Sequence, residues 1–345
     1  MALLNEFGPE FQGHGHSSDF RLSLKTSISS FVSSFLSNLA SSDNQNTRRT
    51  DHGTGYLPDM TLFDPRVTPA RPDLAAARLR GLVAADHYVE GHASHVCAGT
   101  ADLRHAPAPD APLDTQALFG EEVTLYEDHE GWGWVQLVRD GYVGYMSMAA
   151  LAEGPIKRTH RVTVNRSIVY PGPDLKLPPH DALPLGASVC VRATKAGFAQ
   201  IDDAAFVFSG HLMPSGENQK EFVAVAERLL HAPYLWGGKT SLGIDCSGLV
   251  QISLHAAGID VPRDTDLQEK ALGLSIAVDT DLAGLRRGDL VFWRGHVGIM
   301  RDETTLLHAN AHHMLVASEP LRIARDRNLA TTAQPISAIK RLAPA

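Results

Sequence analysis

The sequence predicts a multidomain protein in which two small all-β barrels precede an α+β domain. Its 345 residues are too many for one ordinary hydrophobic core. Short alternating strands separated by turn residues begin near residue 94, and residues 160–213 repeat the same order of features. After Met213 and Pro214 the pattern changes to helical spacing followed by strands, which is typical of an α+β domain.

Residues 1–60 precede the predicted domains and are expected to form a disordered extension. Residues 26–42 follow two basic residues, as in a signal peptide, but nearly half of them are Ser and no apolar run exceeds two residues. We therefore expect a cytoplasmic protein, with export through residues 20–42 as the alternative. Residues 61–93 are expected to be a short helical segment, because residues 73–85 are rich in Ala, Leu and Arg.

The two β stretches are assigned to residues 94–154 and 155–214. In the first, residues 123–127, 134–138 and 142–146 have the alternation of strands, with Gly-containing turns between them. About five short strands in each stretch of about 60 residues predict two small barrels. Residues 215–345 form the expected α+β domain, with helices at 221–231 and 246–259 and strands at 290–293, 296–300 and 305–309.

The composition excludes several classes of partner. A net charge of −8 without any basic run gives no indication of a nucleic-acid partner. No segment reaches the roughly 18 apolar residues that a membrane span needs. Three widely separated cysteines argue against a disulfide framework and for a reducing compartment.

No metal and no other cofactor is expected from the spacing of possible ligands. The run His87-x-x-Glu90-x-His92 resembles a zinc signature but has one residue too many before the second histidine.

Cys246 is the first candidate for chemistry. It opens the helix predicted over residues 246–259, after Gly243 and Asp245. A thiol in the first turn of a helix faces unpaired backbone N–H groups and the positive end of the helix dipole, which should lower its pKa. The alternative is a cysteine buried as a small apolar residue.

Two histidines could serve such a nucleophile. His296 begins one predicted strand and His308 lies in the next, and the two are symmetric about Asp302. An antiparallel pairing would place them opposite one another, so that His308 could fix the tautomer of His296. A single histidine is more often a core or surface residue, and His312 and His313 are assigned to a loop.

Four runs in this region resemble the NlpC/p60 family of papain-like cysteine peptidases: PYLWGGKTSLGIDCSGLV, VPRDTDLQ, LRRGDLVFWRGHVGIM and LLHANAHHM. The resemblance implies a papain-like catalytic domain over residues 215–345. It implies Cys246 as nucleophile, His296 as base and His308 as the orienting residue. It also implies that Tyr234 lies beside the nucleophile and helps to hold the substrate or the oxyanion.

The upstream repeats resemble bacterial SH3-like domains, which precede the catalytic domain in bacterial γ-D-glutamyl-L-diamino acid endopeptidases. The resemblance implies cleavage between D-Glu and the diamino acid of murein peptides that have a free N-terminal L-Ala. The residues matching the substrate site of this group are Asp245 and Ser247 for the ammonium group, Thr265 in place of a frequent Ser, and Tyr142 and Glu121 closing the amine pocket.

The expected partners are therefore murein stem peptides or fragments of them. Two alternatives remain open: an acyltransferase or amidase on the same fold, and a non-catalytic wall-binding protein. The sequence also leaves open the diamino acid, the choice between whole murein and recycled fragments, and the oligomeric state.

Overall fold

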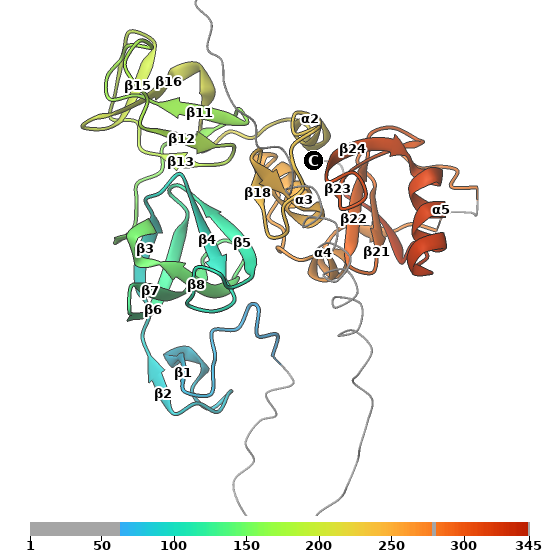
Figure 1. Cartoon of the computed structure of the whole chain (residues 1–345), viewed down its shortest axis with the longest axis horizontal. Helices are drawn as coiled ribbons and strands as arrows, with labels where there is room; N and C mark the ends of the chain where they lie inside the picture. Colours follow the sequence, from blue (N-terminus) through green and yellow to red (C-terminus); the bar gives the residue numbers. More distant parts are fainter. Residues whose placement is uncertain (1–62, 278–280, 344–345) are drawn as a thin grey trace, which may run out of the picture. The chain divides into compact units, whose positions relative to one another are not determined.

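The computed structural model describes residues 63–277 and 281–343, which lie within the second of the chain's two units, Leu57–Ala345 (Figure 1). The expectations for residues 1–60, including export through residues 20–42, lie outside the described residues. Within the described residues, no helix is long and apolar enough to cross a membrane.

The helix predicted over residues 73–85 is wrong. This segment holds β1 (Leu74–Ala76) and a 3₁₀ turn (Ala77–Leu79), and β1 pairs in parallel with β2 (His87–Val89). Leu74 and Ala76 are buried in a small core with Tyr126 and Trp134. Burial against these aromatic rings outweighs the helix propensity of the Ala-rich segment.

The first β module is a seven-stranded sheet in the order β5-β4-β8-β7-β6-β3-β9. Its strands are β3 (His92–Val96), β4 (Thr100–Arg104), β5 (Leu113–Leu118), β6 (Glu122–His129), β7 (Trp132–Leu137), β8 (Val143–Ser147) and β9 (Leu151–Glu153), with a 3₁₀ turn at Met148–Ala150. The strands predicted at 123–127, 134–138 and 142–146 are thus confirmed, and their inward side chains form one core.

The second β module has three small antiparallel sheets around a core of its own. Its strands are β10 (His160–Val162), β11 (Arg166–Val169), β12 (Asp181–Pro184), β13 (Ser188–Val189), β14 (Ala193–Lys195), β15 (Phe198–Asp202), β16 (Ala205–Phe208) and β17 (Leu212–Pro214), with a 3₁₀ turn at Ser209–His211. That this module is a second SH3-like barrel stays a prediction, as do the domain bounds.

The α+β part is built on a six-stranded sheet in the order β20-β25-β21-β22-β23-β24. Its elements are α2 (Phe222–Glu227), β18 (Lys239–Thr240), β19 (Gly243–Ile244), α3 (Cys246–Ala256), α4 (Thr265–Ala271), β20 (Leu274–Ser275), β21 (Leu290–Trp293), β22 (His296–Met300), β23 (Thr305–Asn310), β24 (Leu315–Pro320), α5 (Leu321–Thr332) and β25 (Ala338–Arg341). The α+β character and the predicted strands are confirmed, whereas α4, α5, β18, β19, β20, β24 and β25 were not predicted.

Two cores cover the two faces of this sheet. Val297 and Ile299 pack with apolar residues of α3, whereas Met300 and Leu306 pack with Leu321 of α5. Figure 1 shows the two helices on opposite sides of the strands. The alternation of side chains along β22 therefore places His296 on the opposite face from the residues that hold α3.

The helix α3 begins at Cys246, as expected, and Gly258 follows its end in the left-handed region with φ 80°. The helix predicted over 221–231 is shorter, because the chain turns after Glu227 and His231 takes a φ of 69°. This turn brings Pro233 into a bridge with Leu315. A second bridge, between Tyr234 and Ile244, holds Tyr234 near the start of α3.

Candidate active site

Cys246 is buried at the first residue of α3, 6% exposed. The preceding Asp245 is the N-cap, and one of its carboxylate oxygens accepts the Gly248 N–H at 2.7 Å. The Thr265 hydroxyl, in the first turn of α4, lies 3.8 Å from the Cys246 thiol. The sulfur also has a hydrogen-bonding contact with the backbone of Val297, which follows His296 in β22.

Asp245 and Ser247 are joined in a buried cluster around Arg263. The guanidinium donates to both carboxylate oxygens of Asp245, at 2.9 and 2.7 Å, and to the Ser247 hydroxyl at 2.7 Å. Arg263 is 1% exposed and also donates to Thr115 in β5, at 2.7 Å. The charge of Asp245 is therefore balanced inside the protein, and the first β module is bonded to the same cluster.

His296 and His308 form a hydrogen bond of 2.8 Å between Nε2 and Nδ1. The predicted symmetry about Asp302 is wrong, because Ile299 pairs with Leu307 and Met300 with Leu306. The same register places Gly298 opposite His308 and makes His296 a diagonal neighbour on the same face. A Cβ at Gly298 would lie 2.7 Å from Leu306 Cδ1 and 3.2 Å from the Cβ of His308, so the glycine leaves room for both side chains.

Glu319 extends this pair by one more strand. His308 Nε2 lies 2.8 Å from Glu319 Oε1, and Arg327 of α5 holds the same carboxylate through both oxygens, at 2.5 and 2.8 Å. A carboxylate only accepts, so His308 must carry its proton on Nε2 and accept with Nδ1. His296 then donates from Nε2, which leaves its Nδ1 free as a base.

Burial controls the protonation of the nucleophile and the base. It raises the pKa of the Cys246 thiol to about 11, and the Asp245 carboxylate adds to the shift, while the Val297 backbone and Thr265 oppose it. The prediction of a lowered thiol pKa is thus wrong for this resting site, because desolvation by burial is the largest effect and disfavours the thiolate.

The pKa values of the two histidines are lowered instead. Burial lowers the pKa of His296 to about 3, with His308 and Arg327 acting in the same direction, and burial also lowers the pKa of His308. Although burial alone would raise it, hydrogen bonds from Arg327 and His308 bring the pKa of Glu319 well below its usual range. The resting site near neutral pH therefore holds a thiol, two neutral imidazoles and an ionised Glu319.

A cavity of about 240 Å³ opens in front of Cys246. Its lining residues are Arg66, Asp114, Tyr142, Tyr234, Trp236, Asp245, Cys246, Ser247, Asp264, Thr265, Asp266 and Gly295. The structure thus brings together the predicted residues Tyr142, Tyr234, Asp245, Ser247 and Thr265 around the thiol.

Glu121 is not among the lining residues. Its carboxylate lies 3.3 Å from the ammonium group of Lys239, which is 1% exposed, and accepts the backbone N–H of Leu118 at 3.0 Å. A buried lysine needs such a partner. The structure therefore gives Glu121 a structural contact in place of the predicted place in the amine pocket.

Three acidic residues at the cavity were not predicted. The Tyr142 hydroxyl donates to Asp264 at 3.2 Å, and Arg66 donates to Asp264 at 2.7 Å and to Asp266 at 2.8 Å. Burial raises the pKa of Asp264, while Arg263 and Arg66 oppose the shift, and burial also raises that of Asp114 against the effect of His105. Asp264 and Asp266 lie in the quoted run VPRDTDLQ, whereas no local signal in the sequence pointed to Asp114 or Arg66.

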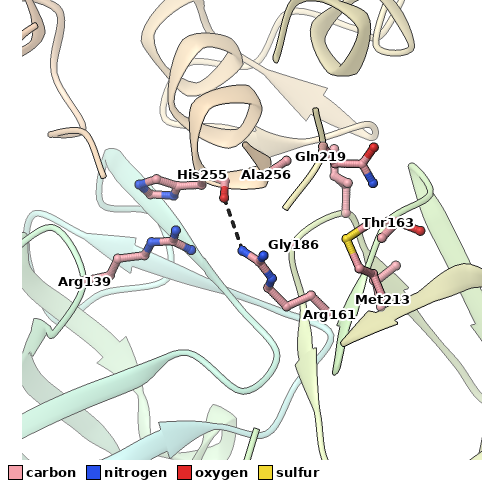
Figure 2. Close-up of a pocket in the computed structure, with 10 residues that line it drawn as sticks. Arg139, Arg161, Thr163, Gly186, Met213, Gln219, His255 and Ala256 are labelled. Atoms are coloured by element: carbon pink, nitrogen blue, oxygen red, sulfur yellow. Dashed lines mark hydrogen bonds between the residues drawn. The ribbon is translucent and has the colours of Figure 1, made fainter. Parts of the chain in front are cut away.

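A second cavity shares no lining residue with the first (Figure 2). It has a volume of about 20 Å³, and Arg139, Arg161 and His255 contribute to its lining. Its size is that of about one water molecule, and none of the predicted site residues lines it.

Two family models match the chain. Residues 231–327 match the NlpC/P60 family and residues 103–151 match the bacterial dipeptidyl-peptidase Sh3 domain. The motif resemblance is therefore confirmed for the catalytic domain and for one SH3-like domain.

Curated relatives have names that agree with these family matches. A gamma-D-glutamyl-L-lysine dipeptidyl-peptidase of Bacillus subtilis (strain 168) is 27% identical over 237 residues, covering 61% of this chain and 76% of that protein. The dipeptidyl-peptidase 6 of Lysinibacillus sphaericus is 35% identical over 92 residues, which are 27% of this chain and 32% of that protein.

A solved structure supports the fold. The crystal structure of an NlpC/P60 family protein from Bacillus cereus ATCC 10987 aligns with a TM-score of 0.60 and 19% identity, over 72% of this chain and 99% of that one. The chain thus carries an NlpC/P60 domain and a bacterial SH3 domain, and it is homologous to the gamma-D-glutamyl-L-lysine dipeptidyl-peptidases.

Proposed function

We propose that this chain is a cysteine endopeptidase that cleaves the γ-D-Glu to diamino acid bond of murein peptides with a free N-terminal L-Ala. The observation that carries the proposal is the position of Cys246. It lies beside the strand that begins with His296, the first residue of the hydrogen-bonded chain His296–His308–Glu319, and it faces a cavity lined by several carboxylates. The names of the homologous dipeptidyl-peptidases support the same bond.

The reaction begins with a neutral Cys246 thiol and a neutral His296 imidazole. Cys246 Sγ attacks the carbonyl carbon of the γ-glutamyl bond while its proton moves to His296 Nδ1. His308 and Glu319 stabilise the imidazolium that forms, because each accepts the hydrogen bond of the ring before it. The Cys246 backbone N–H, at the start of α3, donates to the developing oxyanion.

The second half of the reaction returns the site to its resting state. His296 gives its proton to the leaving amine of the diamino acid, and the acyl group remains on Cys246 as a thioester. His296 then takes a proton from a water molecule, whose oxygen attacks the thioester carbon. The C–S bond breaks, the dipeptide leaves as its carboxylic acid, and His296 returns its proton to Cys246 Sγ.

The acidic lining of the cavity supports selection of a free amine. Asp245 is already paired with Arg263, so it has little charge to offer a substrate. Asp114 lies 3.4 Å from the exposed His105, and within the described residues no arginine or lysine forms an ion pair with it. We infer that Asp114 holds the ammonium group of L-Ala. Tyr142 and Asp264, which Arg66 already pairs, line the pocket beside it, and Asp245 and Ser247 shape the adjoining wall.

The experiment compares L-Ala-γ-D-Glu-diaminopimelate with its N-acetylated copy, with Cys246→Ala as the inactive control. We expect thiol-dependent release of diaminopimelate from the free-amine peptide, and little from the acetylated one. Asp114→Asn should raise KM for the free-amine peptide by about tenfold or more, since a hydrogen bond to a charged group contributes about 1.5–3 kcal/mol. Asp203→Asn, at a carboxylate 97% exposed on the second β module, is the matched control.

The other outcomes separate the alternatives. Equal cleavage of both peptides would remove the amine pocket. Transfer of the dipeptide to an added amine in preference to water would indicate an acyltransferase, and absence of cleavage that depends on Cys246 would favour a wall-binding protein.

We also propose that the substrates are recycled murein fragments and that the protein acts in the cytoplasm, because a pocket for a free amine suits cut peptides better than intact wall. Cell fractionation with an antibody to the chain tests the location. Recovery outside the cytoplasm would support the export alternative.

A further inference from the structure

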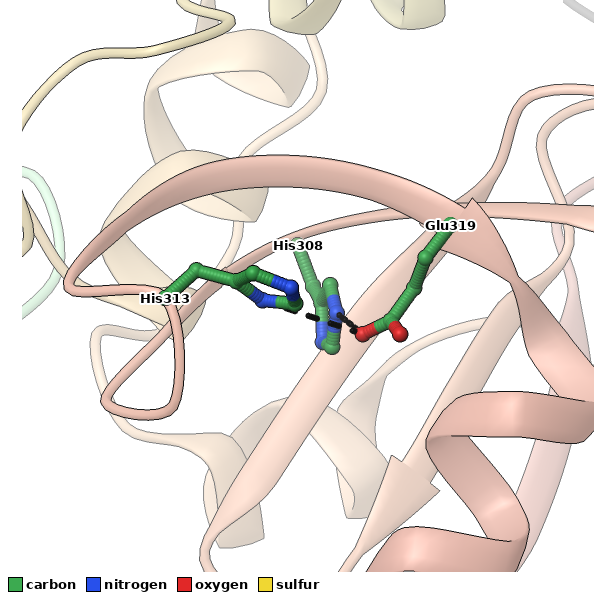
Figure 3. A group of neighbouring side chains, drawn as sticks. All are labelled: His308, His313 and Glu319. Atoms are coloured by element: carbon green, nitrogen blue, oxygen red, sulfur yellow. Dashed lines mark hydrogen bonds and ion pairs between the residues drawn. The ribbon is translucent and has the colours of Figure 1, made fainter.

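His308, His313 and Glu319 form a cluster of possible metal ligands beside the proposed base (Figure 3). One ligand atom of each residue lies within 4.8 Å of the other two. His308 and Glu319 are nearly covered, with side chains 2% and 10% exposed, whereas the His313 ring is 35% exposed. The cluster is therefore open to solvent through His313, in the turn between β23 and β24.

We propose that this cluster is an inhibitory site for a divalent metal of the zinc class. Two imidazoles and one carboxylate are the ligand set of open zinc sites, in which water takes the fourth position. Magnesium and calcium prefer sites made of oxygen ligands, so they are poor candidates.

Binding requires small rearrangements of existing contacts. His308 must exchange its 2.8 Å hydrogen bond to Glu319 for a bond to the metal, and His313 must give up its 3.0 Å contact with Asn310. Arg327 competes for the same carboxylate through both oxygens. We therefore expect reversible binding, weaker than that of a closed structural zinc site.

The bound metal would disable the base by changing two tautomers. His308 would lose its Nε2 proton to solvent and coordinate the metal through that nitrogen, so its neutral ring would carry the remaining proton on Nδ1. That proton comes from His296 Nε2, since these two atoms share the 2.8 Å hydrogen bond. His296 would take one proton from solvent on Nδ1, and no net proton would be released.

The consequence follows from the roles of the two nitrogens in His296. Nδ1 is the atom left free to accept the Cys246 proton when Nε2 faces His308. With the metal bound, Nδ1 already carries a proton, so the imidazole cannot act as the base. The inhibition rests on the proposed function, whereas the metal binding does not.

The binding test uses Zn²⁺ alone and isothermal titration calorimetry. The protein carries Cys246→Ala, Cys97→Ser and Cys190→Ser, so that no thiol can be a ligand. We expect one site, weakened at least tenfold by adding His313→Ala. Adding His312→Ala is the matched control, since His312 is the neighbouring ring of the same turn but is not in the cluster, and it should leave the affinity within about twofold.

The activity test uses the chain with Cys246 intact. Zn²⁺ should inhibit peptide hydrolysis, a chelator should restore it, and His313→Ala should keep the basal rate while raising the inhibitory Zn²⁺ concentration at least tenfold. Equal inhibition of the His313→Ala and unsubstituted proteins would place the metal on Cys246 or His296 and overturn the proposal.

Failure of this proposal is distinguishable from failure of the proposed function. Absence of calorimetric binding, or binding that His313→Ala does not change, overturns the metal site whatever the peptidase assay shows. Absence of hydrolysis, together with binding that depends on His313, removes only the inhibitory consequence.

Discussion

Each proton in the chain from His296 to Glu319 is placed by the group next to it. Arg327 keeps Glu319 ionised, and the ionised carboxylate requires a proton on His308 Nε2. Together these contacts leave His296 Nδ1 as the free base. In the proposed reaction Glu319 is thus a positioning residue, which would act through two imidazoles.

Glu319→Gln should lower kcat by about 10²-fold with little change in KM, because the amide can donate as well as accept and no longer fixes the tautomer. Steady-state kinetics on the free-amine peptide measures the effects on kcat and on KM separately. Glu319→Asp should restore part of the rate, and Glu303→Gln, at an exposed residue, is the control. An unchanged kcat would remove Glu319 from the chain.

Cys246 should react as a thiol and not as a preformed thiolate. Because burial raises its pKa to about 11, the rate of alkylation by iodoacetamide should keep rising above pH 9. Mass spectrometry measures the rate in a Cys97→Ser, Cys190→Ser background. A plateau from about pH 5 to 9 would instead indicate a thiolate–imidazolium pair, against the pKa of about 3 for His296.

At the scale of elements, the start of α3 depends on one buried ion pair. Asp245 caps the helix through Gly248 and also neutralises Arg263, which is 1% exposed. The two tasks are coupled, because the carboxylate that caps the helix is held in place by the guanidinium. The position of Cys246 therefore depends on Arg263, which lies 18 residues after Asp245.

Asp245→Ala should destabilise the protein by about 3–5 kcal/mol, since it leaves the Arg263 charge buried without a partner. Glu221→Ala is the matched control: Glu221 caps α2 by accepting from Val223 and Ala224, and its partner Arg287 is exposed. Loss of that cap should cost about 1 kcal/mol. Urea unfolding compares the two, and equal losses would show that the buried pair adds nothing to the cap.

At the scale of the whole molecule, the first β module supplies part of the wall of the catalytic cavity. Tyr142 donates to Asp264, and Thr115 accepts from Arg263. Leu118, at the end of β5, is buried in the same core as residues of α3. The module therefore contributes to the site itself as well as to the fold.

Tyr142→Phe should raise KM for the free-amine peptide about 5- to 10-fold with kcat unchanged, since it removes one hydrogen bond to Asp264 and keeps the ring in its core. Tyr145→Phe is the control, because its hydroxyl accepts from Arg71 and its ring does not line the cavity. A fall in kcat without a change in KM would mean that Tyr142 acts on the reaction and not on binding.

The sequence by itself determined the order of the modules, the start of α3 and the types of the side chains that take part in the proposed reaction. Those features are local: a cap before Cys246, period-two alternation in β22 and β23, and turn residues between strands. The Ala-rich segment at 73–85 was mispredicted because its burial against Trp134 depends on residues far along the chain.

Only the tertiary structure decided which charges meet at the cavity. Asp114, Arg66 and Asp264 come from separate segments, and no local pattern records that folding brings them to one cavity. Glu319 is brought to His308 from the neighbouring strand in the same way. In the observed pairing register His296 lies two residues away from the position opposite His308 that was predicted for it. A shift of two residues keeps both side chains on the same face of the sheet, so the contact between them remains. Burial then reversed the expected shift of the Cys246 pKa, because desolvation depends on the packing of the whole domain.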